Sequence, residues 1–288
     1  MITQNYRTNL KKNIVLFNLN TKADFTTSAH LLANRCYRQS WVNKQIMIYI
    51  QSNIERTLAH HFDCSCALYG AIDNAMDYRL TSFEEVASGK FDMLIKKNLF
   101  VGSTEFMREV FKRIGLNDVR LLMNSNRDCE IITLEEAHKR VSNGSKLFIK
   151  PFEIKLFTGL ILDGMKYSCL SNLPNETMVM AYEPFKSKII SEWRLYVHND
   201  KLIDARNYSG EFIVSPDYEY AMTIITNNKG KFPCAYTVDI AVLENKQNVV
   251  VEFNDMWAIG NYGIPNDIYL RILKDRYFQI VTQGNTYL

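Results

Sequence analysis

The stretch "VVVEFNDMW", residues Val249–Trp257, decides how the fold is interpreted. It begins as a buried strand should, with three consecutive valines. It then places a carboxylate at Glu252, an amide at Asn254 and a second carboxylate at Asp255. Unpaired charge is costly to bury, so acid and amide groups directly after an apolar run need partners. This pattern predicts a binding site at the end of the strand.

A second apolar strand, "YTVDIAVL", comes just before, and the polar turn "ENKQ" predicts that the two form a hairpin. Residues two apart share a face, so Glu252 and Asn254 should point the same way, together with Val250. Counting back from the turn places Asp239 on the partner strand, opposite the region of Glu252 and Asn254. Mg²⁺ prefers such hard oxygen ligands, with waters and phosphates completing its coordination. The sequence therefore predicts Asp239, Glu252 and Asn254 as metal ligands; the alternative is a solvent-exposed face of a two-sided hairpin.

Two lysines flank a predicted loop in "KLFIKPFEIKLFTG", residues 146–159. Lys150 ends a strand, Pro151 breaks it, and the following loop carries Lys155 and Gly159. Lysine offers a mobile point charge with three donors, which suits a polyphosphate chain. The segment is not a Walker motif, which requires G-x-x-x-x-G-K-[ST]. Taken alone, the stretch favours the simpler alternative of exposed lysines at a strand end.

Two further strands follow, "MVMAYEPF" and "SEWRLYV". A chain leaving a strand has free backbone groups, so Tyr182–Phe185 can pair with the edge of a planar ring. In the second strand Glu192 and Arg194 share a face. The acid suits sugar hydroxyls, and the guanidinium suits a phosphate. A cross-strand salt bridge of Glu192 is an equal alternative.

In this order the pieces resemble the ATP-grasp superfamily, over residues 145–265. The closest likeness is to the clade named for one conserved arginine and two lysines, common in bacteriophages; RimK-like carboxylate–amine ligases are more distant. The resemblance implies that ATP and Mg²⁺ bind here. It assigns the phosphates to Lys150, Lys155, Arg194 and the second candidate Arg206, and catalysis to Arg194 and Lys155. Adenine is assigned to Tyr182, Glu183 and Phe185, and ribose to Glu192. The metal is assigned to Asp239, Glu252 and Asn254. It also makes Trp257, Asn261 and Tyr262 substrate-site candidates.

The resemblance further implies an α+β ATP-grasp fold, with two subdomains that clamp ATP (residues 126–288) after an N-terminal α/β lobe (residues 1–125). It implies a ligase that joins a small carboxylate, such as an amino acid or peptide, to an amine through an acyl phosphate, releasing ADP. A small-molecule kinase and a non-catalytic nucleotide sensor are the alternatives.

The composition limits which partners and which cellular compartment the sequence favours. The chain has 288 residues, of which 47% are hydrophobic and 23% charged, with a net charge of +3. This balance does not indicate nucleic-acid binding. No stretch approaches the ~20 apolar residues of a membrane span. The unpatterned cysteines favour the reducing cytoplasm, which would be the host's if a phage encodes the chain. "HHFDCSC" (60–66) mixes soft-metal ligands, although semi-buried residues after a helix are the favoured interpretation.

Periodicity predicts helices in the first half of the chain and strands after Gly144. A strand is expected over 13–20, and one or two helices within 28–62. Helices are also expected after the caps Ser103 or Thr104 and Thr133. The strands expected in the second half are 146–150, 159–164, 177–185, 191–197, 201–208, 235–243 and 248–254.

Overall fold

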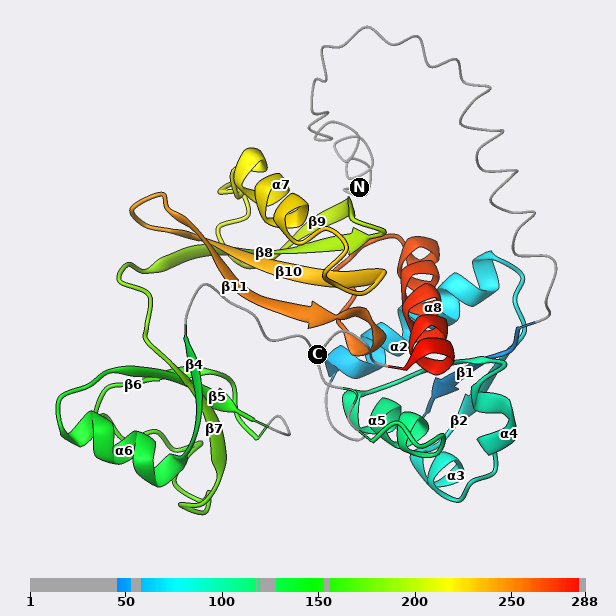
Figure 1. The fold of residues 1–288 in the computed structure, drawn as a ribbon, viewed down its shortest axis with the longest axis horizontal. Helices are drawn as coiled ribbons and strands as arrows, with labels where there is room; N and C mark the ends of the chain where they lie inside the picture. The colour runs from blue at the N-terminus through cyan, green and yellow to red at the C-terminus, as the bar shows by residue number, and fades with distance from the viewer. Residues whose placement is uncertain (1–45, 53–57, 118, 120–127, 153–155, 285–288) are drawn as a thin grey trace, which may run out of the picture. The chain divides into compact units, whose positions relative to one another are not determined.

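The protein, described by a computed structural model over residues 46–52, 58–117, 119, 128–152 and 156–284, contains three sheets in its described part (Figure 1). The first is parallel and the other two are antiparallel. The strand order in the first sheet is β2 (Tyr78–Thr81), β1 (Ile48–Gln51), β3 (Leu99–Val101). In the second sheet it is β4 (Cys129–Thr133), β7 (Met178–Tyr182), β5 (Leu147–Pro151), β6 (Leu160–Leu162). In the third sheet it is β11 (Asn248–Asp255), β10 (Ala235–Leu243), β8 (Ile189–His198), β9 (Lys201–Gly210).

Helices accompany each sheet. The first sheet is accompanied by α2 (Leu58–Asp73), α3 (Phe83–Ala87), α4 (Asp92–Ile95) and α5 (Thr104–Lys112), the second by α6 (Leu134–Ser142), and the third by α7 (Tyr218–Asn227). A short 3₁₀ turn, η1 (Met256–Ala258), leads from β11 towards the last helix, α8 (Asn266–Gln283). No helix in the described residues combines the length and hydropathy needed to cross a bilayer.

The sequence prediction for 28–62 is wrong in one segment. Ile48–Gln51 is not helical but forms the central strand β1, and α2 begins only at Leu58. All four residues of β1 are buried, because α2, α8 and the neighbouring strands surround it. A continuous apolar run is typical of a parallel central strand and lacks the alternation that marks a half-exposed one. The strand expected over 13–20 lies outside the described residues.

The predicted helix starts are confirmed. Ser103 caps α5 by accepting from the Phe106 N–H, and Thr133 caps α6 by accepting from the Glu136 N–H. Each side-chain oxygen satisfies one of the backbone donors that a first helical turn leaves free. The seven strands predicted after Gly144 are also present, with end shifts of a few residues.

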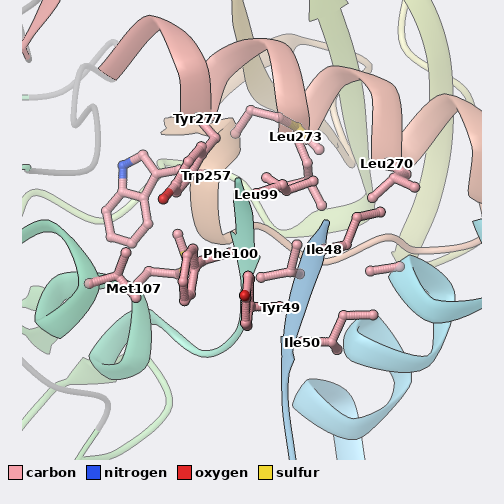
Figure 2. Close-up of a cluster of buried hydrophobic side chains, with 14 of the residues drawn as sticks. Ile48, Tyr49, Ile50, Leu99, Phe100, Met107, Trp257, Leu270, Leu273 and Tyr277 are labelled. Atoms are coloured by element: carbon pink, nitrogen blue, oxygen red, sulfur yellow. The ribbon is translucent and has the colours of Figure 1, made fainter. Parts of the chain in front are cut away.

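The last helix completes the core of the first sheet. Figure 2 shows Leu270, Leu273 and Tyr277 of α8 lying against β1 and β3. Trp257 joins the same core, where its indole ring meets Phe111 edge-on at 5.5 Å between centroids. The first lobe therefore depends on residues that follow the third sheet in sequence. The predicted boundary at 125/126 falls within residues 120–127, outside the described part, and stays a prediction.

The third sheet has one apolar and one polar face. Val238 and Phe253 pack under α7, whereas Thr237 and Asp239 alternate with the apolar residues of β10. A bulge at Asp239/Ile240 shifts the register of β11, so that Ile240 pairs with Val250 and Asp239 with Glu252. The expectation that Val250 shares the face of Glu252 is therefore wrong: an extra residue reverses the alternation, and Val250 packs in the core cluster against α7.

Asp255 answers part of the question posed by "VVVEFNDMW". Its carboxylate accepts two bonds from the Arg276 guanidinium of α8, at 2.7 and 2.6 Å, and both side chains are fully buried. Burial alone would raise the pKa of Asp255, and Arg276 opposes that rise. This acid ties β11 to α8, and so belongs to the packing of the molecule.

Removing one partner of this pair should be strongly destabilising. Asp255→Asn leaves the Arg276 charge buried without a counter-charge, so the free energy of unfolding should fall by about 3–5 kcal/mol. Chemical denaturation followed by circular dichroism measures the change. Asp92→Asn is the matched control, because Asp92 pairs with Arg113 in partly exposed surroundings and should lose less than about 1 kcal/mol. Equal losses in the two variants would contradict this account.

Candidate functional site

A row of four charged residues crosses the polar face of the third sheet. Direct strand pairing places Glu252 opposite Asp239, Asp239 opposite Arg194, and Arg194 opposite Arg206. Residues directly opposite each other point to the same side of a sheet. The face of Asp239, which the sequence left open, is therefore that of Glu252. Asn254 lies two residues further along β11, opposite Thr237.

Lys150 reaches this row from the second sheet. Its Nζ lies 2.5 Å from Glu252 Oε2 and 5.5 Å from the centre of the Tyr182 ring. Asn254 Nδ2 donates to the other oxygen, Glu252 Oε1, at 2.9 Å. Burial would raise the pKa of Glu252, but Lys150, Asn254 and Arg194 outweigh that effect and leave it lowered. Glu252 is thus held as a carboxylate beside a mobile cation.

Arg194 is fixed on several sides. Its Nε and Nη2 donate to the two oxygens of Asp239 at 2.8 and 2.7 Å, and both residues are buried. Two stacked tyrosine rings lie against the guanidinium: Tyr262 at 4.7 Å and Tyr208 at 5.5 Å. The Tyr208 hydroxyl also hydrogen-bonds to Asp239. Such cation–π contacts and bidentate bonds leave little freedom for the guanidinium plane.

The residues predicted for adenine lie at the end of β7 and just after it, and the residue predicted for ribose lies on β8. Tyr182 is buried, and Phe148 lies beside it at 6.0 Å between ring centroids. Glu183 is exposed, whereas Phe185 packs against the cluster of Ala241, Leu243 and Val249 in the third sheet. Glu192 is half-buried on β8, two residues before Arg194. The second and third sheets thus both contribute to this region.

A family model matches residues 125–272, just over half of the chain. It describes an ATP-grasp domain, the second family of the clade named for one arginine and two lysines. The chain belongs to this ATP-grasp family. Its α+β fold is accordingly the ATP-grasp fold, and the family predicted from the sequence is confirmed.

Solved structures give more distant likenesses. D-alanine–D-alanine ligase from Bacillus anthracis is 9% identical over 84% of this chain and 100% of its own, with a TM-score of 0.49. The ATP-grasp ligase PsnB with precursor peptide PsnA2 and AMPPNP is 10% identical over 81% and 98%, with a TM-score of 0.44. N5-carboxyaminoimidazole synthetase from Staphylococcus aureus is 11% identical over 82% and 78%, with a TM-score of 0.45. No curated protein matches the sequence significantly.

Other predicted residues of this ATP-grasp protein have different outcomes. Lys155 lies outside the described residues. Arg206 is present in the row, and its Nη2 donates to Asp204 at 2.6 Å. Trp257 is wrong as a substrate-site candidate, because its ring is 1% exposed within the first lobe. The Asn261 side chain bonds within its own loop, to Gly263 N–H and Ile264 C=O.

The "HHFDCSC" segment lies on α2 and not after a helix. The side chains of His60 and His61 lie outside the described part, and Cys64 and Cys66 are buried free thiols. Among the described residues, no group of three or more His, Cys, Asp or Glu side chains is placed so that it could hold a metal ion. The soft-metal interpretation therefore gains no support from the residues seen.

Two residues at the site escaped sequence reasoning. Tyr208 follows Arg206 by two positions and therefore shares its face of β9, where its ring stacks on Tyr262. That spacing was the signal that could have found it. Asp63, in the "HHFDCSC" segment, accepts from the Asn261 N–H at 2.8 Å through Oδ1. An acid within a mostly apolar helix was the signal, and the surrounding cysteines and histidines obscured it.

The donor set suits a divalent cation. Glu252 and Asn254 offer a carboxylate and an amide oxygen from one face of β11, and the Lys150 ammonium shows that a positive charge is accommodated against Glu252. Asp239 accepts two bonds from Arg194 and one from Tyr208, yet an ionised carboxylate has about four lone-pair sites, so about one remains. These residues fit the hard-ligand chemistry of Mg²⁺.

Replacing Lys150 should change the ionisation of its partner. In Lys150→Met the pKa of Glu252 should rise, because the ammonium that favours the charged form is gone while the burial that disfavours it remains. Carboxyl ¹³C NMR titration of the nucleotide-free protein follows this group. Lys146→Met, which removes an exposed lysine just before β5, should leave the Glu252 titration unchanged. An unchanged pKa in Lys150→Met would mean that the ion pair does not form in solution.

Proposed function

We propose that the protein is an ATP- and Mg²⁺-dependent carboxylate–amine ligase that works through an acyl phosphate. The observation that supports this most is the in-register row of Glu252, Asp239 and Arg194, which Lys150 reaches from another sheet. Phosphoryl transfer asks a protein mainly to position groups and to neutralise charge. A row of two neighbouring acids and two neighbouring cations, partly buried and facing a lysine from another sheet, suits that requirement.

Each residue of the row has a role in the proposal. Glu252 and Asn254 hold the magnesium ion, and Asp239 contributes through its remaining lone-pair site. When bound, that ion neutralises charge that develops on the phosphates. Lys150 releases Glu252 and donates to the phosphate chain. Arg194 has its Nη1 left to steady the transferring phosphoryl group.

The remaining predicted residues complete the nucleotide site in this proposal. The main chain of Tyr182, Glu183 and Phe185 receives adenine, and Glu192 receives the ribose hydroxyls. Arg206 stands at the far end of the row as a second phosphate ligand. Lys155 comes between β5 and β6 in the sequence and is proposed on that sequence position alone.

The proposed reaction has two steps. A substrate carboxylate attacks the γ-phosphorus, the bond to the bridging oxygen breaks, and ADP leaves. The amine then attacks the acyl carbonyl, the C–N bond forms, and phosphate leaves. An open pocket of about 380 Å³ beside the Asn261–Asn266 loop, also lined by Cys66 and Tyr69, is large enough for a small substrate.

A direct assay combines the protein with ATP, Mg²⁺ and a mixture of the twenty amino acids. We expect ADP release together with a new amide that mass spectrometry detects. A product phosphorylated on a hydroxyl would instead indicate that the protein is a kinase and not a ligase. Tight ATP binding with no ADP release under any acceptor would indicate a nucleotide sensor instead.

Glu252→Ala should reduce ADP release by about 100-fold or more while the protein stays folded, because a metal ligand contributes several kcal/mol of transition-state stabilisation. Glu244→Ala is the control, since Glu244 is an exposed acid in the turn of the same hairpin. Circular dichroism verifies the fold. Near-full turnover in Glu252→Ala would remove this residue from the metal site.

Lys150→Ala should weaken ATP binding by about 10- to 100-fold, the usual contribution of a charge-assisted hydrogen bond of about 1.5–3 kcal/mol. Isothermal titration with ATP and Mg²⁺ measures the affinity. Lys146→Ala provides the matched control from the exposed lysine just before β5. If both variants bind ATP as the parent does, Lys150 has no part in the nucleotide site.

A further inference from the structure

Asp63 is an acid of α2 that stands beside the Arg194 row without taking part in it. Its Oδ1 accepts from the Asn261 N–H at 2.8 Å. Helix α2 packs closely against the start of α8, since a Cβ on Gly70 would approach the Asn266 carbonyl oxygen to 2.6 Å. Helix and loop thus hold the carboxylate in place. Among the described residues, no hydrogen-bond donor reaches the other oxygen, Oδ2.

Three functional groups converge beside Gly260. A Cβ on this glycine would lie 3.6 Å from Asp63 Oδ2, 3.6 Å from Tyr262 Cζ and 3.7 Å from Arg194 Nη1. Any side chain at this position would therefore contact all three groups, and the glycine leaves the approach to them free of a side chain of its own. A carboxylate, an aromatic ring and the unshared end of a guanidinium thus lie around one point of the main chain.

The chemistry of that position suits an amine. The Asp63 carboxylate favours an ammonium group by charge and by hydrogen bonding. The Nη1 group of Arg194 suits the oxygen of the partner that the amine will attack. We propose that Asp63 binds the ammonium group of the acceptor substrate and takes its proton before amide formation. This inference rests on the proposed ligase function and names the acceptor as a primary amine.

The surroundings of Asp63 fit a proton acceptor. Burial raises its pKa to about 6, opposed by the Asn261 N–H and by Arg194. Arg194 is the one charged group that faces it from the described elements. The remaining titratable neighbours are neutral near pH 7, because burial raises the pKa of each. They are Cys64 and Cys66 on α2, at about 12 and 11, Tyr196 on β8, Tyr262 in the loop and Tyr269 on α8.

The step balances as follows. The ammonium nitrogen gives one proton to Asp63 Oδ2, which becomes a neutral carboxylic acid. The free amine attacks the carbonyl carbon of the acyl phosphate, the new C–N bond forms, and the C–O bond to phosphate breaks. A second proton leaves the nitrogen as the amide forms, and Asp63 returns its own to solvent. A base with a pKa near 6 is ionised at pH 7 and binds protons better than an ordinary aspartate.

The test compares two nucleophiles in the same protein. The twenty amino acids supply both the carboxylates and the amines, whereas hydroxylamine is largely unprotonated at pH 7 and needs no base. Asp63→Asn should lower amide formation by about 100-fold or more, the usual contribution of a general base. Hydroxamate formation with hydroxylamine should stay within about threefold. Asp73→Asn, an exposed acid on the same helix, should change neither rate.

The pH profile adds a second readout. In the parent protein the rate of amide formation should fall as the pH drops through about 6, because protonated Asp63 cannot accept a proton. Asp63→Asn should lack this limb, and Asp63→Glu should restore part of the rate. Near-parental amide formation in Asp63→Asn, or an equal loss with hydroxylamine in the folded variant, would overturn the inference. Absence of both products in the parent protein would instead overturn the ligase proposal.

Discussion

The buried ion pair between Arg194 and Asp239 is the constraint on which the rest of the site depends. Two charges in the interior are tolerated only when their geometry and hydrogen bonds compensate for lost hydration. Both bonds here are short and bidentate. A slip of one residue between β8 and β10 would bury each charge alone on opposite faces of the sheet. The pair therefore fixes the register that aligns Glu252 on one side of it and Arg206 on the other.

Charge exchange is the second theme of the site. In the nucleotide-free molecule, Lys150 supplies the positive charge against Glu252. That contact keeps the acid ionised, which is the form a metal requires. In the proposed function it also holds the Lys150 ammonium at the place where a nucleotide would meet the ion. Arg194 and Asp239 show the opposite behaviour, since their mutual bonds are buried and fixed. One pair can rearrange and the other sets the frame.

Local sequence signals predicted most of this architecture, and long-range packing decided the rest. Alternation and turn residues located the strands of the second half, and caps located the helices at Ser103 and Thr133. The face predicted for Val250 was wrong, because no residue type signals the bulge that shifts the register of β11. In "VVVEFNDMW" Trp257 was a substrate-site candidate and Asp255 was an acid with no assigned partner, but contacts with Phe111 and Arg276, far along the chain, place both in the core. Only the folded structure brings Asp63 close to Gly260, so the sequence alone could not predict its place at the site.

The most direct measurement is a crystal structure with Mg²⁺ and a non-hydrolysable ATP analogue. The account predicts an ion about 2.0–2.1 Å from oxygens of Glu252 and Asn254. It also predicts that the Lys150 ammonium has moved from Glu252 to a phosphate oxygen, while Arg194 stays on Asp239. An ion bound elsewhere, or a nucleotide that leaves the Lys150–Glu252 contact intact, would contradict it.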